Sequence, residues 1–230
     1  MKLKNIGLHP KFMIYKNKIN YIFIFLITLF LINLFNYDIK FQHDAQLHNY
    51  PIFSIINFDF KNIDTPYGLI YYSYVSIFSV IAYPFYFFDI LSPRESFYLM
   101  VRISNIILFV LSFFFSYRLS KAIFKNESFF LYLPTLLIFS LSSVQRSFFM
   151  VKPENLIFTL IIFASYYIYK FFNEQKLEKK HFWILAISLF IIGSQKINGF
   201  IYVFIFFSFC LFFIKNNKII LKFAILVFSL

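Results

Sequence analysis

Seven apolar stretches separated by short polar segments constrain the fold of this chain more than any other feature. A helix that crosses the hydrocarbon core of a bilayer needs roughly 17–25 mostly apolar residues. Charged residues make up 14% of the chain, against about 25% in soluble domains, so a soluble core is not a serious alternative. The sequence predicts an all-α polytopic membrane bundle, with residues 1–230 as a single transmembrane domain. The predicted spans are residues 21–37, 96–117, 128–144, 155–172, 182–195 and 197–214, and the beginning of another at 219–230.

The two ends of the chain carry further expectations. Five lysines precede the first apolar stretch, and no small-residue cleavage site follows it, so we interpret residues 21–37 as an uncleaved first span. At the other end, Leu230 lies inside an apolar run, which leads us to expect the N-terminal part of a longer protein. Cys210 is the single cysteine, so an internal disulfide is excluded.

The segment 67–88 decides the topology. It is long enough to cross a membrane, but it is rich in Tyr and Ser, and Pro84 is expected to break or kink it. If it does not cross, 15 of the 22 Lys and Arg lie on the cytoplasmic side; if it crosses, 10 do and 12 lie outside. Cytoplasmic loops carry an excess of Lys and Arg. The charge pattern favours a segment that does not cross and a cytoplasmic N-terminus. We expect a multi-pass protein of the bacterial inner (plasma) membrane.

The net charge of +12 has the same explanation. In a soluble protein such a charge would suggest a nucleic-acid partner. Here the basic residues lie between apolar segments, where the positive-inside rule accounts for them. We therefore expect the membrane, and no nucleic acid, as a partner.

The polar segment 38–66, after the first span, is predicted to be a structured external loop that holds a site. It carries four carboxylates, Asp38, Asp44, Asp59 and Asp64, and two histidines, His43 and His48. Ionisable groups beside a bilayer are costly unless they are used. If the segment is helical, Asp44 and His48 share a face.

Three roles for Asp44 follow from its position. It could act as a general base that deprotonates an acceptor hydroxyl. Together with His48 it could instead bind a divalent ion, although two ligands make an incomplete site. The structural alternative is a helix cap, since Asp is a favoured N-cap residue. Asp64 precedes a turn formed by Pro66 and Gly68, which is expected to begin the next helix.

Several basic residues lie where the favoured topology disfavours cations. Arg146 and Lys152-Pro153-Glu154 lie between two predicted spans, and Lys196 lies between two more, bracketed by Gly193 and Gly199, which would allow a tight reversal. Arg102 lies inside the predicted span 96–117, where an arginine usually faces a cavity or partner. These cations could bind a lipid phosphate, or they could extend to the headgroups as ordinary interfacial residues. With the loop carboxylates they would form one external site.

The order of these motifs resembles the GT-C superfamily of membrane glycosyltransferases, in particular the branch with protein O-mannosyltransferases and lipid A aminoarabinose transferases. The matching features are His43-Asp44-Ala45 after the first span, the Tyr-rich TPYGLIYYSYVSIF, the Arg-containing VRISNIILFV, the basic-Pro-acidic KPE and the sequence GSQKING. They extend over most of residues 20–215. Many members have Asp-Glu where this chain has Asp44-Ala45, so the resemblance assigns neither a metal nor an acceptor class.

The resemblance implies a GT-C-like helical bundle and an inverting glycosyltransferase that uses a polyprenyl-phosphate-linked sugar. The acceptor would be a lipid, a protein or a glycan on the outer face of the membrane. Asp44 is the implied catalytic residue, with Asp64 as the second choice. The expected contacts to the lipid phosphate and sugar are His48, Arg102, Arg146, Lys152, Glu154 and Lys196. The alternatives are a phospholipid-headgroup or acyl transferase, and a lipid-linked-oligosaccharide flippase or other transporter, although no internal repeat typical of transporters is visible.

Overall fold

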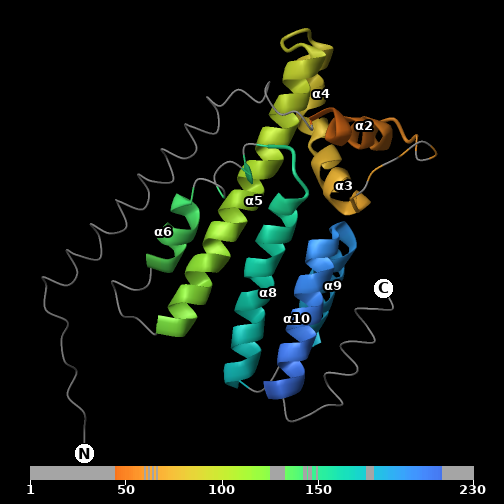
Figure 1. The fold of residues 1–230 in the computed structure, drawn as a ribbon. Helices are drawn as coiled ribbons and strands as arrows, with labels where there is room; N and C mark the ends of the chain where they lie inside the picture. Colours follow the sequence, from red (N-terminus) through yellow and green to blue (C-terminus); the bar gives the residue numbers. More distant parts are fainter. Residues whose placement is uncertain are drawn as a thin grey trace, which may run out of the picture. The chain divides into compact units, whose positions relative to one another are not determined.

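The computed structural model describes residues 45–59, 61, 63, 65, 67–124, 133–141, 144, 147–148, 150–174 and 179–213 (Figure 1). The side chains of residues 45–48, 140, 172–174, 179–180 and 209–213 are not described. The chain divides into two compact units, Met1–Asp38 and Ile39–Leu230, and all described residues belong to the second. The predicted spans 21–37 and 219–230 lie outside the described residues.

Within the described residues every regular element is a helix, which confirms the prediction of an all-α fold. The helices are α2 (Ala45–Ile56), α3 (Leu69–Ile77), α4 (Ser79–Phe87), α5 (Pro93–Phe124), α6 (Leu133–Ser140), α8 (Glu154–Glu174), α9 (Lys179–Gln195) and α10 (Ile197–Phe213). Four of the predicted spans correspond to α5, α8, α9 and α10. Of the predicted span 128–144, the described helical part is mainly α6.

Helix α5 is the longest element, and α8 packs along it (Figure 1). Among the described residues, α5 alone is long and apolar enough to cross a membrane by itself, and α3 with α4 would add a second span if the bent pair counts as one. The 32 residues of α5 extend about 48 Å at roughly 1.5 Å per residue, more than the roughly 30 Å of a hydrocarbon core. The polytopic arrangement stays a prediction.

A row of small polar side chains joins α5 to its neighbours. The Ser112 hydroxyl lies 2.8 Å from the hydroxyl of Thr159 in α8, and the Ser116 hydroxyl lies 2.9 Å from that of Thr135 in α6. All four residues are buried. In apolar surroundings, small residues allow helices to approach closely, and hydrogen bonds between helices hold them together. This row therefore fixes α6 and α8 against α5.

Helices α9 and α10 form a hairpin that packs against α8 through buried aliphatic side chains. Lys196 is the single residue between the two helices, so the predicted tight reversal is confirmed. Gly199 is required there, because a Cβ at this position would lie 1.9 Å from the Ile192 carbonyl oxygen. Glycine is not required at position 193, because the nearest neighbour of an added Cβ would be Val203 Cγ2 at 3.7 Å, an ordinary contact.

The ambiguous segment 67–88 forms two helices, α3 and α4, which meet at an angle of 49°. The turn before Leu69 is where the sequence predicts it, with Gly68 as the N-cap of α3. The expected break at Pro84 is wrong, since Pro84 lies inside α4 and the break is at Phe78. Proline removes one backbone donor, and α4 tolerates that loss. Both α3 and α4 pack on α5, and α2 packs on α3.

Candidate functional site

The ends of three helices that are far apart in the sequence meet at one place. The backbone N–H of Gly68, before α3, donates to the backbone carbonyl of Gln195, at the end of α9, over 3.0 Å. The Tyr71 N–H donates to the side-chain Oε1 of Gln195, also over 3.0 Å. Gln195 is 1% exposed. One buried amide therefore accepts a backbone donor from the first turn of α3, where helices leave such donors unsatisfied.

Glycine at position 68 allows this contact. A Cβ at Gly68 would lie 2.4 Å from the Ser194 carbonyl oxygen and 2.5 Å from Gln195 Nε2. Any larger residue would push the start of α3 away from the end of α9. The sequence pattern indicated a turn at Gly68, but only the structure shows its partner.

Tyr71 connects α3 to the segment that leads into α8. Its hydroxyl accepts a hydrogen bond of 3.1 Å from the backbone N–H of Lys152, and its side chain is fully buried. A polar group buried without a partner is costly, so this bond fixes the backbone position of Lys152. Residues Lys152 and Glu154 are thereby held beside the α9–α10 turn.

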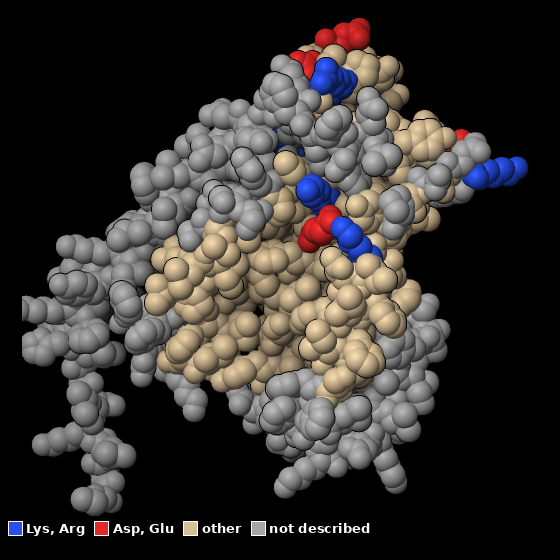
Figure 2. Space-filling model, viewed as in Figure 1, with Lys and Arg blue, Asp and Glu red and all other residues tan. Residues whose placement is uncertain are grey.

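Lys196 and Glu154 form an ion pair at this junction. The Lys196 ammonium also lies 4.9 Å from the centre of the Tyr67 ring, in cation–π geometry. Figure 2 shows basic and acidic side chains close together in the middle of the viewed face, with described residues other than Lys, Arg, Asp and Glu directly below them. Glu154 is the first residue of α8, where a carboxylate complements the helix dipole.

The protonation of this pair follows from its contacts. Burial raises the pKa of the Glu154 carboxyl, but the hydrogen bond from Lys196 and the nearby charges of Lys196 and Lys152 outweigh it. The pKa of Glu154 therefore lies below its ordinary value of 4.5. The hydrogen bond to Glu154 raises the pKa of Lys196 above its ordinary 10.5, against the smaller effect of burial. Both groups are charged at neutral pH.

Replacement of Glu154 by glutamine is expected to lower the thermal midpoint by an amount that is constant from about pH 5 to about pH 10. Below this window Glu154 is protonated as the pH falls through its lowered pKa, and above it Lys196 loses its proton. The side chains of Lys196 and Glu154 are 27% and 40% exposed. The two proteins should therefore differ in the free energy of unfolding by about 1 kcal/mol or less. Thermal unfolding of both proteins across pH tests this. A difference that changes between about pH 6 and pH 9 would contradict the assignment.

Lys152 differs from Lys196 in its contacts with the described residues. Within the described residues the Lys152 ammonium forms no ion pair, although it is close enough to lower the pKa of Glu154. Its side chain is half-buried. Among the described residues, two cations and one carboxylate therefore lie at this junction, and Lys152 is the cation that no described carboxylate pairs with.

Arg102 lies on α5 near the same segment. Three residues further along, the Asn105 amide donates a 2.9 Å hydrogen bond to the Met150 carbonyl, and the Asn155 amide donates to the same carbonyl over 3.1 Å. Arg102 is half-buried. The segment that carries Lys152 therefore contacts α5 at Asn105, which is less than one helical turn from Arg102.

The structure therefore brings together three of the predicted site residues, Lys152, Glu154 and Lys196, with Arg102 on the adjacent turn. Asp44, Asp64 and Arg146 lie outside the described residues, as does the side chain of His48. Among the described residues no three His, Cys, Asp or Glu side chains could share a metal ion. A divalent ion on Asp44 and His48 stays a prediction.

Sequence reasoning missed the uncharged residues that hold the junction. Tyr67, Tyr71 and Gln195 carry no charge, so the pattern of charged residues in the sequence does not point to them. Tyr67 and Tyr71 are spaced four apart, but Tyr67 precedes the N-cap of α3, so helical spacing gives no signal that they belong together. Gln195 has no such signal either, because its contact with Tyr71 spans 124 positions.

Comparison with known proteins finds no matching family model, no similar curated protein and no similar solved structure.

Proposed function

We propose that this chain is a polytopic membrane glycosyltransferase of the GT-C type. It would transfer a sugar from a polyprenyl-phosphate-linked donor to a lipid, protein or glycan acceptor on the outer face of the membrane. The observation that supports the proposal is that Lys152 lies beside the Lys196–Glu154 pair and forms no ion pair with a described residue. A cation fixed at the end of apolar helices suits a phosphate whose lipid chain lies in the bilayer.

The reaction needs a base, a cation and a defined geometry. The acceptor hydroxyl oxygen attacks the anomeric carbon of the sugar, and its proton passes to the Asp44 carboxylate. The bond between the anomeric carbon and the phosphate oxygen breaks, and polyprenyl phosphate leaves with the electron pair. Lys152, with Arg102 and Arg146, would stabilise the charge that grows on the phosphate.

The ion pair has a different role from the one expected for Lys196. A lysine whose charge is neutralised by a carboxylate contributes little to the binding of another anion. We infer that Lys196 and Glu154 position the α9–α10 turn against Tyr67 and so keep Lys152 in place. Their substitution should impair donor binding only indirectly.

Replacement of Lys152 by glutamine is expected to weaken donor binding by about 1.5–3 kcal/mol, the range for hydrogen bonds to charged groups. The backbone N–H that binds Tyr71 is unchanged in this variant, so the fold should persist. Binding of a fluorescent polyprenyl-phosphate sugar to the protein in detergent micelles measures the effect.

The matched control is Lys121→Gln, which removes an exposed lysine from the last turn of α5. It should leave donor affinity unchanged, because Lys121 lies about 19 residues and almost 30 Å along the helix from Arg102. Equal affinities for Lys152→Gln and wild type would remove Lys152 from the phosphate site.

A further inference from the structure

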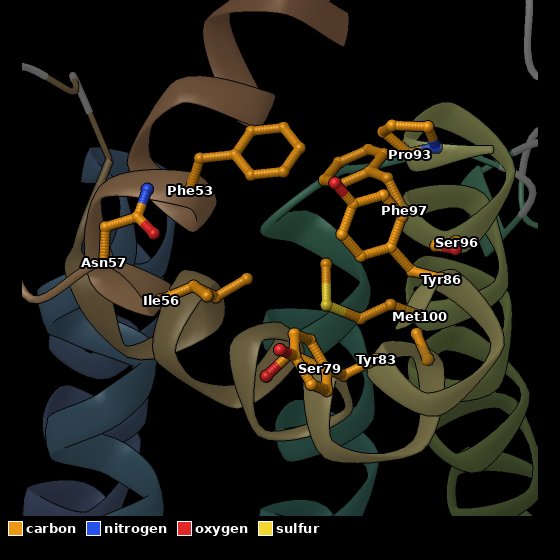
Figure 3. A pocket seen from close by; sticks show the side chains of 11 residues that line it. Phe53, Ile56, Asn57, Ser79, Tyr83, Tyr86, Pro93, Ser96, Phe97 and Met100 are labelled. Atoms are coloured by element: carbon orange, nitrogen blue, oxygen red, sulfur yellow. The ribbon is translucent and has the colours of Figure 1, made fainter. Parts of the chain in front are cut away.

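A separate pocket of about 290 Å³ lies between α2, α4 and α5. Figure 3 shows Phe53 of α2 on one side and Phe97 and Met100 of α5 on the other. The Phe53 and Phe97 rings are stacked, with their centroids 5.3 Å apart. None of the residues that line the pocket belongs to the candidate site at Lys152, Glu154 and Lys196.

The walls of the pocket select an uncharged, apolar ligand. None of its lining residues is Lys, Arg, Asp, Glu or His, and most of them are aromatic or aliphatic. An ion taken into such surroundings would lose its hydration without a partner of opposite charge. A phosphate or free carboxylate is therefore a poor occupant, and a hydrocarbon chain is a good one.

Ser96 adds one specific polar contact. Its side chain lines the pocket and is 7% exposed. Its Oγ is buried and has no hydrogen-bond partner among the described residues, although its backbone N–H donates to the Ser92 carbonyl in the first turn of α5. A buried hydroxyl without a partner costs free energy, and a ligand with a neutral acceptor, such as an ester carbonyl, would remove that cost.

The neighbouring surface fits contact with lipid. On α4, Val80 is 76% exposed, Ile81 46% and Phe87 65%, so the outer face of the helix that forms one wall is apolar. A second wall is α5, which is long and apolar enough to cross a membrane. A bilayer lipid could therefore reach the pocket without passing through water.

We propose that this pocket binds one acyl chain of a membrane glycerophospholipid, with the ester carbonyl of that chain accepting a hydrogen bond from the Ser96 hydroxyl. The volume corresponds to roughly ten groups of the size of a water molecule, at about 30 Å³ each. It thus holds the upper part of one chain. The proposal is independent of the sugar transfer proposed above and uses none of its residues.

The test is photolabelling of the full chain in phosphatidylglycerol–phosphatidylcholine vesicles that contain a phosphatidylcholine with a diazirine in its acyl chain. Mass spectrometry should find the label on the peptide that contains Phe97 and Met100. Ala82→Phe fills the pocket from α4 and should abolish this label. Val80→Phe, which adds the same side chain on the exposed face of α4, should retain it.

Ser96→Ala gives a second readout that does not depend on the tolerance of position 82. The probe fraction needed for half-maximal labelling should rise roughly two- to tenfold, the loss of one hydrogen bond. Ser208→Ala is the control, because the hydroxyl that it removes forms a hydrogen bond within α10. This variant should leave the probe fraction for half-maximal labelling unchanged. A diazirine fatty acid should label more weakly than the phospholipid.

Three results would overturn the proposal. The first is label at Phe97 and Met100 that persists in folded Ala82→Phe. The second is equal half-maximal fractions for Ser96→Ala and Ser208→Ala. The third is stronger labelling by the free fatty acid, which would mean that the pocket accepts a carboxyl group and not a phospholipid ester.

Discussion

Replacement of Asp44 by asparagine should lower sugar transfer by about a hundredfold to ten-thousandfold, the contribution of a positioned general base. The amide has nearly the same shape as the carboxylate but cannot accept the acceptor proton. Asp44 directly precedes Ala45, the first residue of α2. Because Asn caps a helix as well as Asp, the fold and donor binding should be retained. Initial rates with a radiolabelled donor, together with donor affinity, measure both effects.

The same substitution separates the base from the helix cap. If Asp44 only capped α2, the asparagine variant would transfer sugar at close to the normal rate. That result would remove Asp44 from the mechanism, and Asp64→Asn would be the next variant to measure. Asp59→Asn, at an exposed position of the same polar segment, is the matched control and should retain activity.

The second large effect is expected at Gly199, where alanine should lower the free energy of unfolding by about 3 kcal/mol, the upper part of the usual range for overpacking. The added Cβ would lie 1.9 Å from the Ile192 carbonyl oxygen. This neighbour is backbone, so a change of rotamer cannot relieve the clash. For a chain of this size the thermal midpoint should fall by about 6–12 °C.

Gly193→Ala is the matched control in the same hairpin. Its Cβ would make only ordinary contact with Val203, and alanine is the better helix former by about 0.5–1 kcal/mol. The Gly193 variant should therefore melt at or slightly above the wild-type temperature. Equal midpoints for the two variants would mean that α9 and α10 do not meet as described.

The fold could be predicted where one local signal determines it. Long, mostly apolar stretches indicated the positions of α5, α8, α9 and α10, and the polar residue Lys196 marked the reversal between the last two. The break inside 67–88 could not be located in this way. Pro84 was the strongest local signal, but a helix can lose one backbone hydrogen bond, and the chain instead turns at Phe78.

Of the candidate site, only the charged residues could be predicted from the sequence. Lys152, Glu154 and Lys196 were recognised because ionisable groups are rare among apolar helices. Their relation to one another was not visible, since Lys196 pairs with Glu154 across 42 positions. The sequence suggested similar phosphate-binding cations, whereas the structure pairs Lys196 with Glu154 and, among the described residues, shows no ion pair of Lys152. Such a distinction depends on tertiary packing, which periodicity and spacing do not encode.

The most direct test of the proposed function follows both halves of the donor in vesicles. The protein is reconstituted with a polyprenyl-phosphate sugar that carries one isotope in the sugar and another in the lipid. We expect the sugar to appear on an acceptor while an equal amount of polyprenyl phosphate is released, and both signals to fall in the Asp44→Asn variant. Transbilayer movement of the donor with both isotopes still joined would contradict the proposal and identify a flippase.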